Sequence, residues 1–241
     1  MTALVVLPTY NERPNIERVA EGILRHDWTR LLVVDDASPD GTADAAERVG
    51  AKFPGRLEVL RRQGPRGLGL AYVEGLARAL RSDAEAIGQM DADLSHNPDH
   101  LPALMAAIAD HDLVIGSRYV IGGGVVNWPV HRVALSAFAN RYIRTITGLP
   151  THDCTSAYRL WRREALARLP LANARANGYA FLTEMLYQAA RQGCRIAEVP
   201  IVFVERQEGY SKVSSRVLVE SLLMPWRLAL RGGRARPRSG S

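Results

Sequence analysis

The sequence has few of the features that mark secreted, metal-stapled or membrane-spanning proteins. Only two of its 241 residues are cysteines, Cys154 and Cys194, and neither lies in a CxxC pair. This excludes a disulfide framework and a structural zinc site, and we expect a reduced, cytosolic setting. No stretch approaches the ~18 uncharged apolar residues of a membrane-spanning helix. The apolar run in the N-terminal MTALVVLPTYNE is short and lacks the basic segment of a signal peptide.

Lysine is also scarce. Lys52 and Lys212 are the only lysines among 31 basic residues, an arginine bias that we attribute to genome composition. The net charge of +6 and the pI of about 9.7 are compatible with nucleic acid, anionic membranes or phosphorylated substrates, and do not choose among them. Hydrophobic residues at 47% and charged residues at 23% are near globular averages, which excludes disordered, collagen-like and coiled-coil classes.

Short apolar runs alternate with longer amphipathic stretches in the first half of the chain. This alternation predicts an α/β fold, with a mostly parallel sheet and right-handed crossover helices. The run LLVV at 31–34 is apolar on both faces, as expected for a strand covered by helices on each side. We expect strands at 4–7, 31–34, 57–60, 86–90 and 113–115, and helices near 14–26, 40–52, 69–82 and 98–110.

Three further segments are expected after residue 120. The glycine-rich stretch 121–126 predicts a flexible loop, and a helix follows over about 131–147. The apolar run 196–204 predicts a late strand broken by Pro200. No internal repeat is visible.

The C-terminal part predicts an appendage to a main domain over residues 1–210. Residues 211–231 carry apolar side chains at helical spacing, with Pro225 expected to kink or interrupt the helix, and residues 232–241 predict a disordered basic tail. Two interpretations of the helix stay open: an interfacial helix with Trp226 and Arg227 at lipid headgroups, or a helix packed on the domain.

Polar and acidic residues follow several of the predicted strands. In open α/β sheets ligands bind beyond the carboxyl ends of the strands, so these residues are the candidates for a site. Three acidic clusters and one arginine are expected to converge on one edge. They are Glu12 in PTYNE, Asp35 and Asp36 in DDASPDGT, Asp91 and Asp93 in MDADLSHNP, and Arg118 in GSRY.

Asp91-Ala92-Asp93 is the sharpest of these motifs. A D-x-D pair at a strand end holds a hard divalent cation, because Mg²⁺ takes one or two carboxylates together with substrate phosphates. The alternative is that Ser95 or Asn97 caps the following helix and the aspartates are simply solvated. The neighbouring acidic strand ends favour the metal site.

Three other positions suggest nucleotide contacts. Asp36 is placed to accept hydrogen bonds from a base or ribose, Tyr10 to stack on a base, and Glu12 to bond a ring N–H or a ribose. The loop Gly64–Gly69 is neither GxGxxG nor a P-loop, and we expect it to lie against the ligand. Turn and cap chemistry accounts for the residues from Ser38 to Thr42. The spacing of the histidines matches no common zinc site, so we interpret them as ordinary polar residues; they are His96, His131 and His152.

Motifs along most of the chain resemble one known family. PTYNE, DDASPDGT, GLGLAY, MDADLSHNP, GSRY, DCTSAYR, VPIVFVER and GYSK occur in that order. The chain thereby resembles the family-2 glycosyltransferases of GT-A fold that include dolichol-phosphate mannose synthase and polyprenol monophosphomannose synthase. The resemblance implies a GT-A domain whose acceptor side is formed after about residue 120.

The resemblance also implies roles for individual residues. The guanosine would be held by Pro8, Tyr10, Glu12, Val34 and Asp36. The diphosphate and metal would be held by Asp91, Ala92 and Asp93, with Asp93 as the direct ligand and Ser95 where relatives often carry a longer glutamine. Phosphates of donor and acceptor would meet Arg118, Arg206 and Lys212, and Arg132 matches a further basic position. The run 153–158 departs from the commoner form and is given a positioning role only.

The implied reaction is an inverting transfer of mannose from GDP-mannose to a polyprenyl phosphate, with Mg²⁺ or Mn²⁺. An acceptor phosphate with a second pKa of about 6 is largely dianionic at neutral pH and needs no general base. A peripheral enzyme on the cytoplasmic face of the membrane, with or without a membrane-protein anchor, would suit a lipid acceptor.

Alternative functions stay open at this point. The nearest is the same chemistry with another nucleotide sugar, such as UDP-glucose. A nucleic-acid binder is disfavoured because the acidic strand ends would repel a phosphate backbone, and a non-catalytic nucleotide-sugar sensor would show no turnover.

Overall fold

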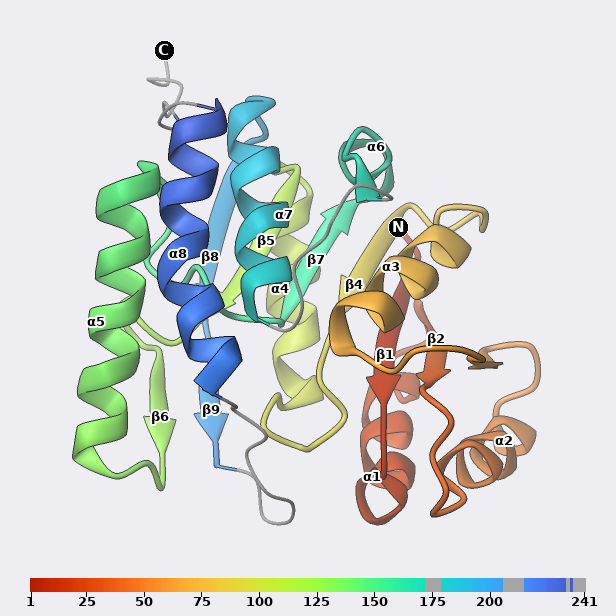
Figure 1. Ribbon diagram of the computed structural model, residues 1–241. Helices are drawn as coiled ribbons and strands as arrows, with labels where there is room; N and C mark the ends of the chain where they lie inside the picture. Colours follow the sequence, from red (N-terminus) through yellow and green to blue (C-terminus); the bar gives the residue numbers. More distant parts are fainter. Residues whose placement is uncertain (172–178, 206–214, 233–234, 236–241) are drawn as a thin grey trace.

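The computed structural model describes residues 1–171, 179–205, 215–232 and 235. Within these residues a seven-stranded sheet has the order β3-β2-β1-β4-β7-β5-β8, and β6 pairs with β9 in a second, small sheet (Figure 1). The strands are β1 (Ala3–Thr9), β2 (Thr29–Asp35), β3 (Leu57–Arg61), β4 (Ala86–Gln89), β5 (Leu113–Ser117), β6 (Gly124–Val126), β7 (Arg159–Arg162), β8 (Ile196–Pro200) and β9 (Val202–Val204). The helices are α1 (Arg13–Leu24), α2 (Thr42–Lys52), α3 (Leu68–Ala79), the 3-10 turn η1 (Pro98–His100), α4 (Leu101–Ile108), α5 (Val130–Thr147), α6 (Arg163–Ala167), α7 (Tyr179–Arg191) and α8 (Ser215–Gly232).

The predicted mostly parallel α/β sheet is confirmed. β1 pairs in parallel with β2 and β4, and β5 with β8, whereas β7 is antiparallel to both of its neighbours. Each predicted strand and helix of the first half is present. The sequence analysis did not predict β7, because a four-residue segment with arginine at both ends shows no strand periodicity.

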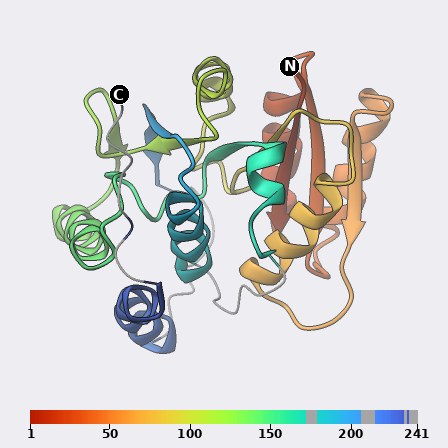
Figure 2. The ribbon, with the colours of Figure 1, turned by 90° about the horizontal axis from the view of Figure 1, so that it is seen from above.

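Side-chain alternation along the strands builds two apolar cores. Val5 and Leu7 face the layer of α1, α2 and α4, whereas Leu4 and Val6 face α3 and α7 on the opposite side. Figure 2 shows helices on both faces of the sheet. Gly75 lets α3 approach closely, since a Cβ there would lie 2.6 Å from Val6 Cγ1.

One expectation for the second half is wrong: the predicted flexible loop at 121–126 contains strand β6. The predicted strand at 196–204 is broken after Pro200, as expected, but its two parts, β8 and β9, lie in different sheets. Ile201 joins them: its N–H donates to the Ser117 carbonyl and its own carbonyl accepts from Gly124. Pairing with a distant partner therefore orders β6, and local glycine content could not reveal this.

Of the two effects expected of Pro225, a kink or an interruption of the helix, the interruption does not occur, because α8 continues through Pro225. Packing compensates for the missing proline hydrogen bond. Met224 and Leu228 are buried, Tyr187 Oη donates to the Leu228 carbonyl at 3.0 Å, and Trp226 Nε1 donates to Tyr142 Oη at 2.9 Å. One face of α8 is thus packed on the domain.

The tail predicted over 232–241 lies outside the described residues except for two positions. Gly232 ends α8, and Ala235 donates from its N–H to the Thr147 carbonyl at 2.8 Å. None of the helices in the described part of the chain is long and apolar enough to cross a membrane.

Candidate active site

The predicted site residues of the first half gather at one edge of the sheet. β1, β2 and β4 are parallel, so Tyr10, Asp36 and Asp91 follow neighbouring strands that end on the same side (Figure 1). Arg118 directly follows β5, which runs parallel to them beyond β7. The topology therefore brings acidic groups and an arginine to one edge.

The backbone of these strand-end loops is strained. Among the described residues, the non-glycine positions with positive φ are Asn11, Ala37, Leu94 and Asn127, with φ between 56° and 66°. Asn11, Ala37 and Leu94 follow β1, β2 and β4, whereas Asn127 follows β6 of the small sheet. Left-handed conformations cost free energy for residues with a Cβ and concentrate at functional sites. The three positions after β1, β2 and β4 therefore support the assignment of this edge as the site.

Asp36, which directly follows β2, is held in a fixed orientation. Its buried carboxylate forms an ion pair with Arg62 and accepts the Gly67 N–H at 2.7 Å. Arg62 is also buried and bonds Glu74 at 2.8 Å. The loop Gly64–Gly69 is thus tied to Asp36. Sequence reasoning missed Arg62, because no local signal distinguishes it from the arginine beside it.

The remaining residues predicted for the nucleoside surround Asp36. Pro8 and Val34 are register partners on β1 and β2. The Val34 side chain lies in the apolar core under α3 and is not accessible to a ligand. Tyr10 Oη accepts a hydrogen bond from Arg66, whose guanidinium lies 4.8 Å from the Tyr10 ring centroid.

Glu12 is held at the start of α1. Its carboxylate accepts from Asn15 Nδ2 at 2.9 Å, and its N–H donates to Thr42 Oγ1 at 3.0 Å. Thr42 begins α2, so this contact ties the loops that follow β1 and β2 to each other. The two loops predicted to surround a nucleoside therefore form one connected unit.

The D-x-D motif offers oxygen ligands after β4. Asp93 is buried and accepts from both the N–H and the hydroxyl of Ser95, whereas Asp91 is partly exposed and accepts from Tyr72 Oη at 3.3 Å. Ser95 therefore does not cap the next helix. That role belongs to Asn97, whose side chain accepts from the Asp99 N–H at 3.0 Å.

This donor set fits a hard divalent cation. In the described part of the chain, no group of three or more His, Cys, Asp or Glu side chains is arranged to hold a metal by itself. One or two carboxylates completed by substrate phosphates are what Mg²⁺ and similar ions use. Asp93 and Asp91, with the Ser95 hydroxyl beside them, are the residues that would hold it, and the ion would stabilise charge on a leaving diphosphate.

His96 stabilises the D-x-D turn through a hydrogen bond to its main chain. Its Nδ1 accepts the Asp91 N–H at 3.2 Å, and its ring packs against Tyr158 and Phe203. Burial lowers the pKa of His96, so the imidazole is neutral at physiological pH. His152 is more exposed and bonds Glu198 at 2.9 Å. Both are structural polar residues, as expected.

Arg118 is locked in a buried ion pair. Its Nε and one terminal nitrogen donate to the two carboxylate oxygens of Asp153, both at 2.7 Å, and that nitrogen also donates to Thr155 Oγ1 at 2.8 Å. Burial would raise the pKa of Asp153, but the charge and hydrogen bonds of Arg118 hold this pKa below its ordinary value. The run 153–158 therefore positions Arg118.

Glu198 on β8 fixes this turn in place. Its carboxylate accepts the main-chain N–H groups of His152 at 2.7 Å and Asp153 at 2.9 Å. Sequence reasoning named neither Glu198 nor the pairing of Asp153 with Arg118, since both link segments far apart in the chain.

A second arginine lies close to Arg118. Arg132, in the first turn of α5, forms an ion pair with Glu205 and stacks on the ring of Trp128. Arg118 and Arg132 both lie near that ring, so the structure brings together two of the four cations predicted for phosphates. The other two, Arg206 and Lys212, lie outside the described residues.

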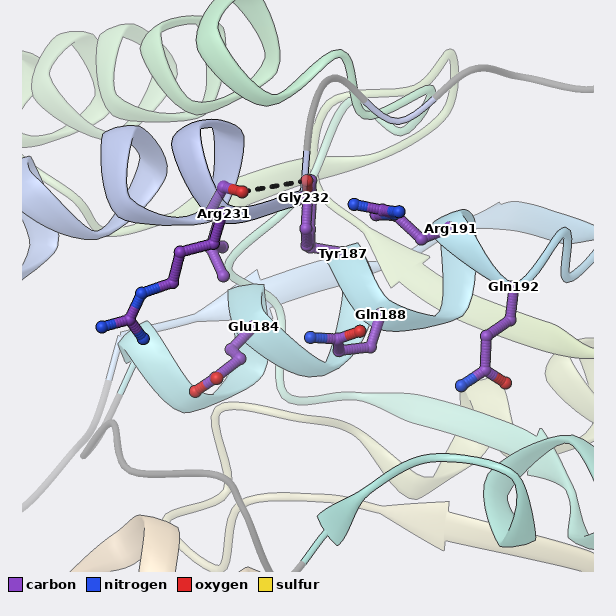
Figure 3. Close-up of a pocket in the computed structure, with 8 residues that line it drawn as sticks. Glu184, Tyr187, Gln188, Arg191, Gln192, Arg231 and Gly232 are labelled. Carbon is purple, nitrogen blue, oxygen red and sulfur yellow. Dashed lines mark hydrogen bonds between the residues drawn. The ribbon is translucent and has the colours of Figure 1, made fainter.

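A cavity of about 430 Å³ lies elsewhere, between α7 and α8 (Figure 3). Its lining includes Glu184, Gln188, Arg191 and Arg231. Arg191 ends α7 just before β8 begins, so the cavity is near the amino ends of the parallel strands. It lies at the edge opposite the candidate site, and no described site residue lines it.

The fold and the acidic, D-x-D-bearing strand ends define a nucleotide-sugar transferase of the GT-A class. The chain belongs to glycosyl transferase family 2, whose family model matches residues 4–169. It is 41% identical over 232 residues to a polyprenol monophosphomannose synthase of Mycolicibacterium smegmatis, covering 95% of this chain and 87% of that protein. It is also 41% identical to an undecaprenyl-phosphate mannosyltransferase of Micrococcus luteus, with both chains covered completely.

Solved structures agree on the fold. A mannosyltransferase from Pyrobaculum calidifontis, solved with GDP-Man and Mn²⁺, superposes with a TM-score of 0.65 at 24% identity, over 97% of this chain and 65% of that one. The glucosyl-3-phosphoglycerate synthase of Mycobacterium tuberculosis, solved with Mn²⁺, UDP and phosphoglyceric acid, gives 0.69 at 22% identity, over 99% and 80%. The predicted GT-A fold is thereby confirmed.

Proposed function

We propose that this glycosyltransferase moves mannose from GDP-mannose to a polyprenyl phosphate. The observation that carries the proposal is that a D-x-D turn and the oriented Asp36 carboxylate lie at the same sheet edge as Arg118, with Arg132 close to Arg118. The donor diphosphate and the acceptor phosphate are both anions. A divalent ion held by the D-x-D turn would offset the charge of the diphosphate, and the two arginines would bind the acceptor phosphate. Relatives of nearly full length named for mannosyl transfer to polyprenyl phosphates support the sugar and the acceptor.

The roles of the residues follow from their positions. Asp36, oriented by Arg62, and Tyr10 bind the nucleoside. Asp91 and Asp93 would hold the divalent ion, which would offset the charge of the diphosphate. Arg118, fixed by Asp153, and the more exposed Arg132 bring the acceptor phosphate to the anomeric carbon. A phosphate oxygen attacks that carbon, the bond to the diphosphate breaks, and inversion results. Positioning and charge stabilisation account for the rate.

The donor is tested with a panel of nucleotide sugars. GDP-mannose is expected to give the highest kcat/KM for transfer to farnesyl phosphate, compared with UDP-glucose, UDP-mannose and GDP-glucose. The GDP-Man bound by the Pyrobaculum enzyme supports this choice, and the UDP bound by the Mycobacterium enzyme makes UDP-glucose the main competitor. A higher kcat/KM for any uridine nucleotide would overturn the donor assignment.

The identity of the nucleophile is tested by the pH dependence of kcat/KM. If the acceptor dianion attacks without a base, the acidic limb of log kcat/KM follows ionisation of the lipid phosphate, near pH 6. An alkylphosphonate acceptor with a higher second pKa is expected to shift this limb upward by the same amount. A limb that stays fixed would indicate an enzyme carboxylate as base, and Asp91 would be the first to test.

Membrane contact on the cytoplasmic face is part of the proposal, since a polyprenyl phosphate resides in a bilayer. α5 and α8 pack together (Figure 2). Only Asn140, Ile143 and Thr147 of α5 are buried. The sequence of α5 includes arginines but no acidic residue, which favours an anionic leaflet. The described apolar side chains that are exposed on these two helices, which we call the α5/α8 face, are Val130, Leu135, Phe138, Leu222, Leu223, Trp226 and Leu230.

Substitutions on the α5/α8 face test this contact better than truncation, because Met224 and Leu228 of α8 are buried. Replacing Leu135, Phe138 and Leu230 together by glutamine is expected to lower partitioning onto anionic vesicles about 100-fold, because each exposed apolar side chain contributes about 1 kcal/mol and about 1.4 kcal/mol corresponds to tenfold. Co-sedimentation at low and high salt measures this.

A control variant, Leu70→Gln, changes an exposed leucine on α3 and is expected to sediment like the parent. Activity on long polyprenyl phosphates in bilayers should fall with binding, whereas activity on soluble farnesyl phosphate should persist. Equal sedimentation of the folded triple variant would contradict docking by this face.

A further inference from the structure

Trp128 connects β6 to α5 and lies against both arginines assigned to the acceptor phosphate. The Arg132 guanidinium carbon is 4.1 Å from the Trp128 ring centroid, and that of Arg118 is 5.7 Å away. Phe203 on β9 packs edge-on against the same ring, with centroids 5.4 Å apart. The indole therefore contacts the cationic part of the site without belonging to any predicted motif.

The two arginines are restrained to very different degrees. The Arg118 side chain is 8% exposed and its partner Asp153 is 0% exposed, so the pair cannot separate without leaving a buried charge. The Arg132 and Glu205 side chains are 38% and 37% exposed. Ion pairs at this exposure contribute little free energy and exchange readily. Arg132 is thus the arginine that can change partner.

The indole N–H indicates why tryptophan occupies this position. Trp128 Nε1 is buried and has no hydrogen-bond acceptor among the described residues. A buried donor without a partner costs stability, and phenylalanine would avoid that cost. Tryptophan has the most favourable ring face for a cation. Its presence is therefore explained by the ring face that it offers to arginine.

We propose that Trp128 positions Arg132 for the acceptor phosphate and that Glu205 occupies Arg132 until this phosphate displaces it. The dianionic phosphate carries more charge than a carboxylate and competes for the same guanidinium. Trp128 then keeps the guanidinium in place during the exchange. This inference rests on the proposed function, since it assigns the acceptor phosphate to Arg132.

Substitutions of Trp128 and of Glu205 should change KM for farnesyl phosphate in opposite directions. Trp128→Leu removes the cation–π contact and is expected to raise KM for farnesyl phosphate about threefold to tenfold. Glu205→Gln removes the competing charge and is expected to lower that KM about twofold to fivefold. KM for GDP-mannose should stay within twofold in both variants. Steady-state kinetics with each substrate at saturation of the other measures these constants.

Trp128→Phe distinguishes an effect on the position of Arg132 from an effect on the stability of the fold. It keeps an aromatic face and removes the unpartnered N–H, so its urea midpoint should equal or exceed that of the parent while KM for farnesyl phosphate is intermediate. A rise of KM in Glu205→Gln would overturn the competing role of Glu205. The positioning role of Trp128 would be overturned if Trp128→Leu left KM for farnesyl phosphate unchanged. It would also be overturned if KM rose equally for farnesyl phosphate and GDP-mannose. A parent protein with no transfer to farnesyl phosphate would overturn the proposed function and this inference together.

Discussion

Replacing Asp93 by alanine is expected to lower mannosyl transfer about 100-fold to 1000-fold, the usual loss when a preorganised electrostatic group is removed. Asp93 is one of the two carboxylates that follow β4, and its orientation is set by two hydrogen bonds from Ser95. Without it, a divalent ion and the diphosphate lose an anchoring oxygen. Turnover with GDP-mannose and Mn²⁺ measures the loss.

Binding of the donor should change in parallel. Calorimetric titration with GDP is expected to show that the gain in affinity on adding Mn²⁺ is lost in Asp93→Ala. Asp99→Ala is the matched control, because Asp99 lies in the same segment but is exposed and paired with Arg25. Activity of Asp93→Ala within tenfold of the parent would contradict the metal assignment.

Replacing Asp153 by alanine should destabilise the fold and also disable the site. Asp153 is completely buried and paired with Arg118 at 2.7 Å, and removing one partner of a buried pair costs about 3–5 kcal/mol. Urea unfolding measures this loss. The double replacement Arg118→Met with Asp153→Leu should be less destabilised than Asp153→Ala, since it leaves no buried charge, yet it should be inactive.

The pH dependence of stability tests the same pair. The pKa of Asp153 lies below its ordinary value, so the unfolded chain binds the proton more readily than the folded one. The stabilisation is therefore present above about pH 4, the ordinary Asp pKa, and is lost as pH falls through the lowered pKa. Asp153→Asn should remove this component of acid sensitivity. If the free energy of unfolding of Asp153→Asn fell at low pH as steeply as that of the parent, the lowered pKa of Asp153 would be contradicted.

Local pattern was sufficient for the first half of the fold. β1, β2, β4 and β5 are short runs of mostly apolar, buried residues, and the partly exposed β3 shows the apolar alternation LEVL. The D-x-D motif and Asp36 were found because they directly follow such runs. Local pattern was not sufficient where a distant partner decides the conformation: β6 forms by pairing with β9, β7 pairs with both β4 and β5, and α8 packs on the domain and is not interrupted at Pro225.

The sequence by itself determined the class of fold, the acidic strand ends and the oxygen-rich chemistry of the site, since these depend on residue type and on adjacency along the chain. Only the tertiary structure decided how each charge is held. Arg62 orients Asp36 across 26 residues, Asp153 fixes Arg118 across 35, and Glu205 pairs with Arg132 across 73. Such partners are chosen by proximity in space and by burial, which raises the cost of an unpaired charge. Neither quantity is visible in the linear sequence.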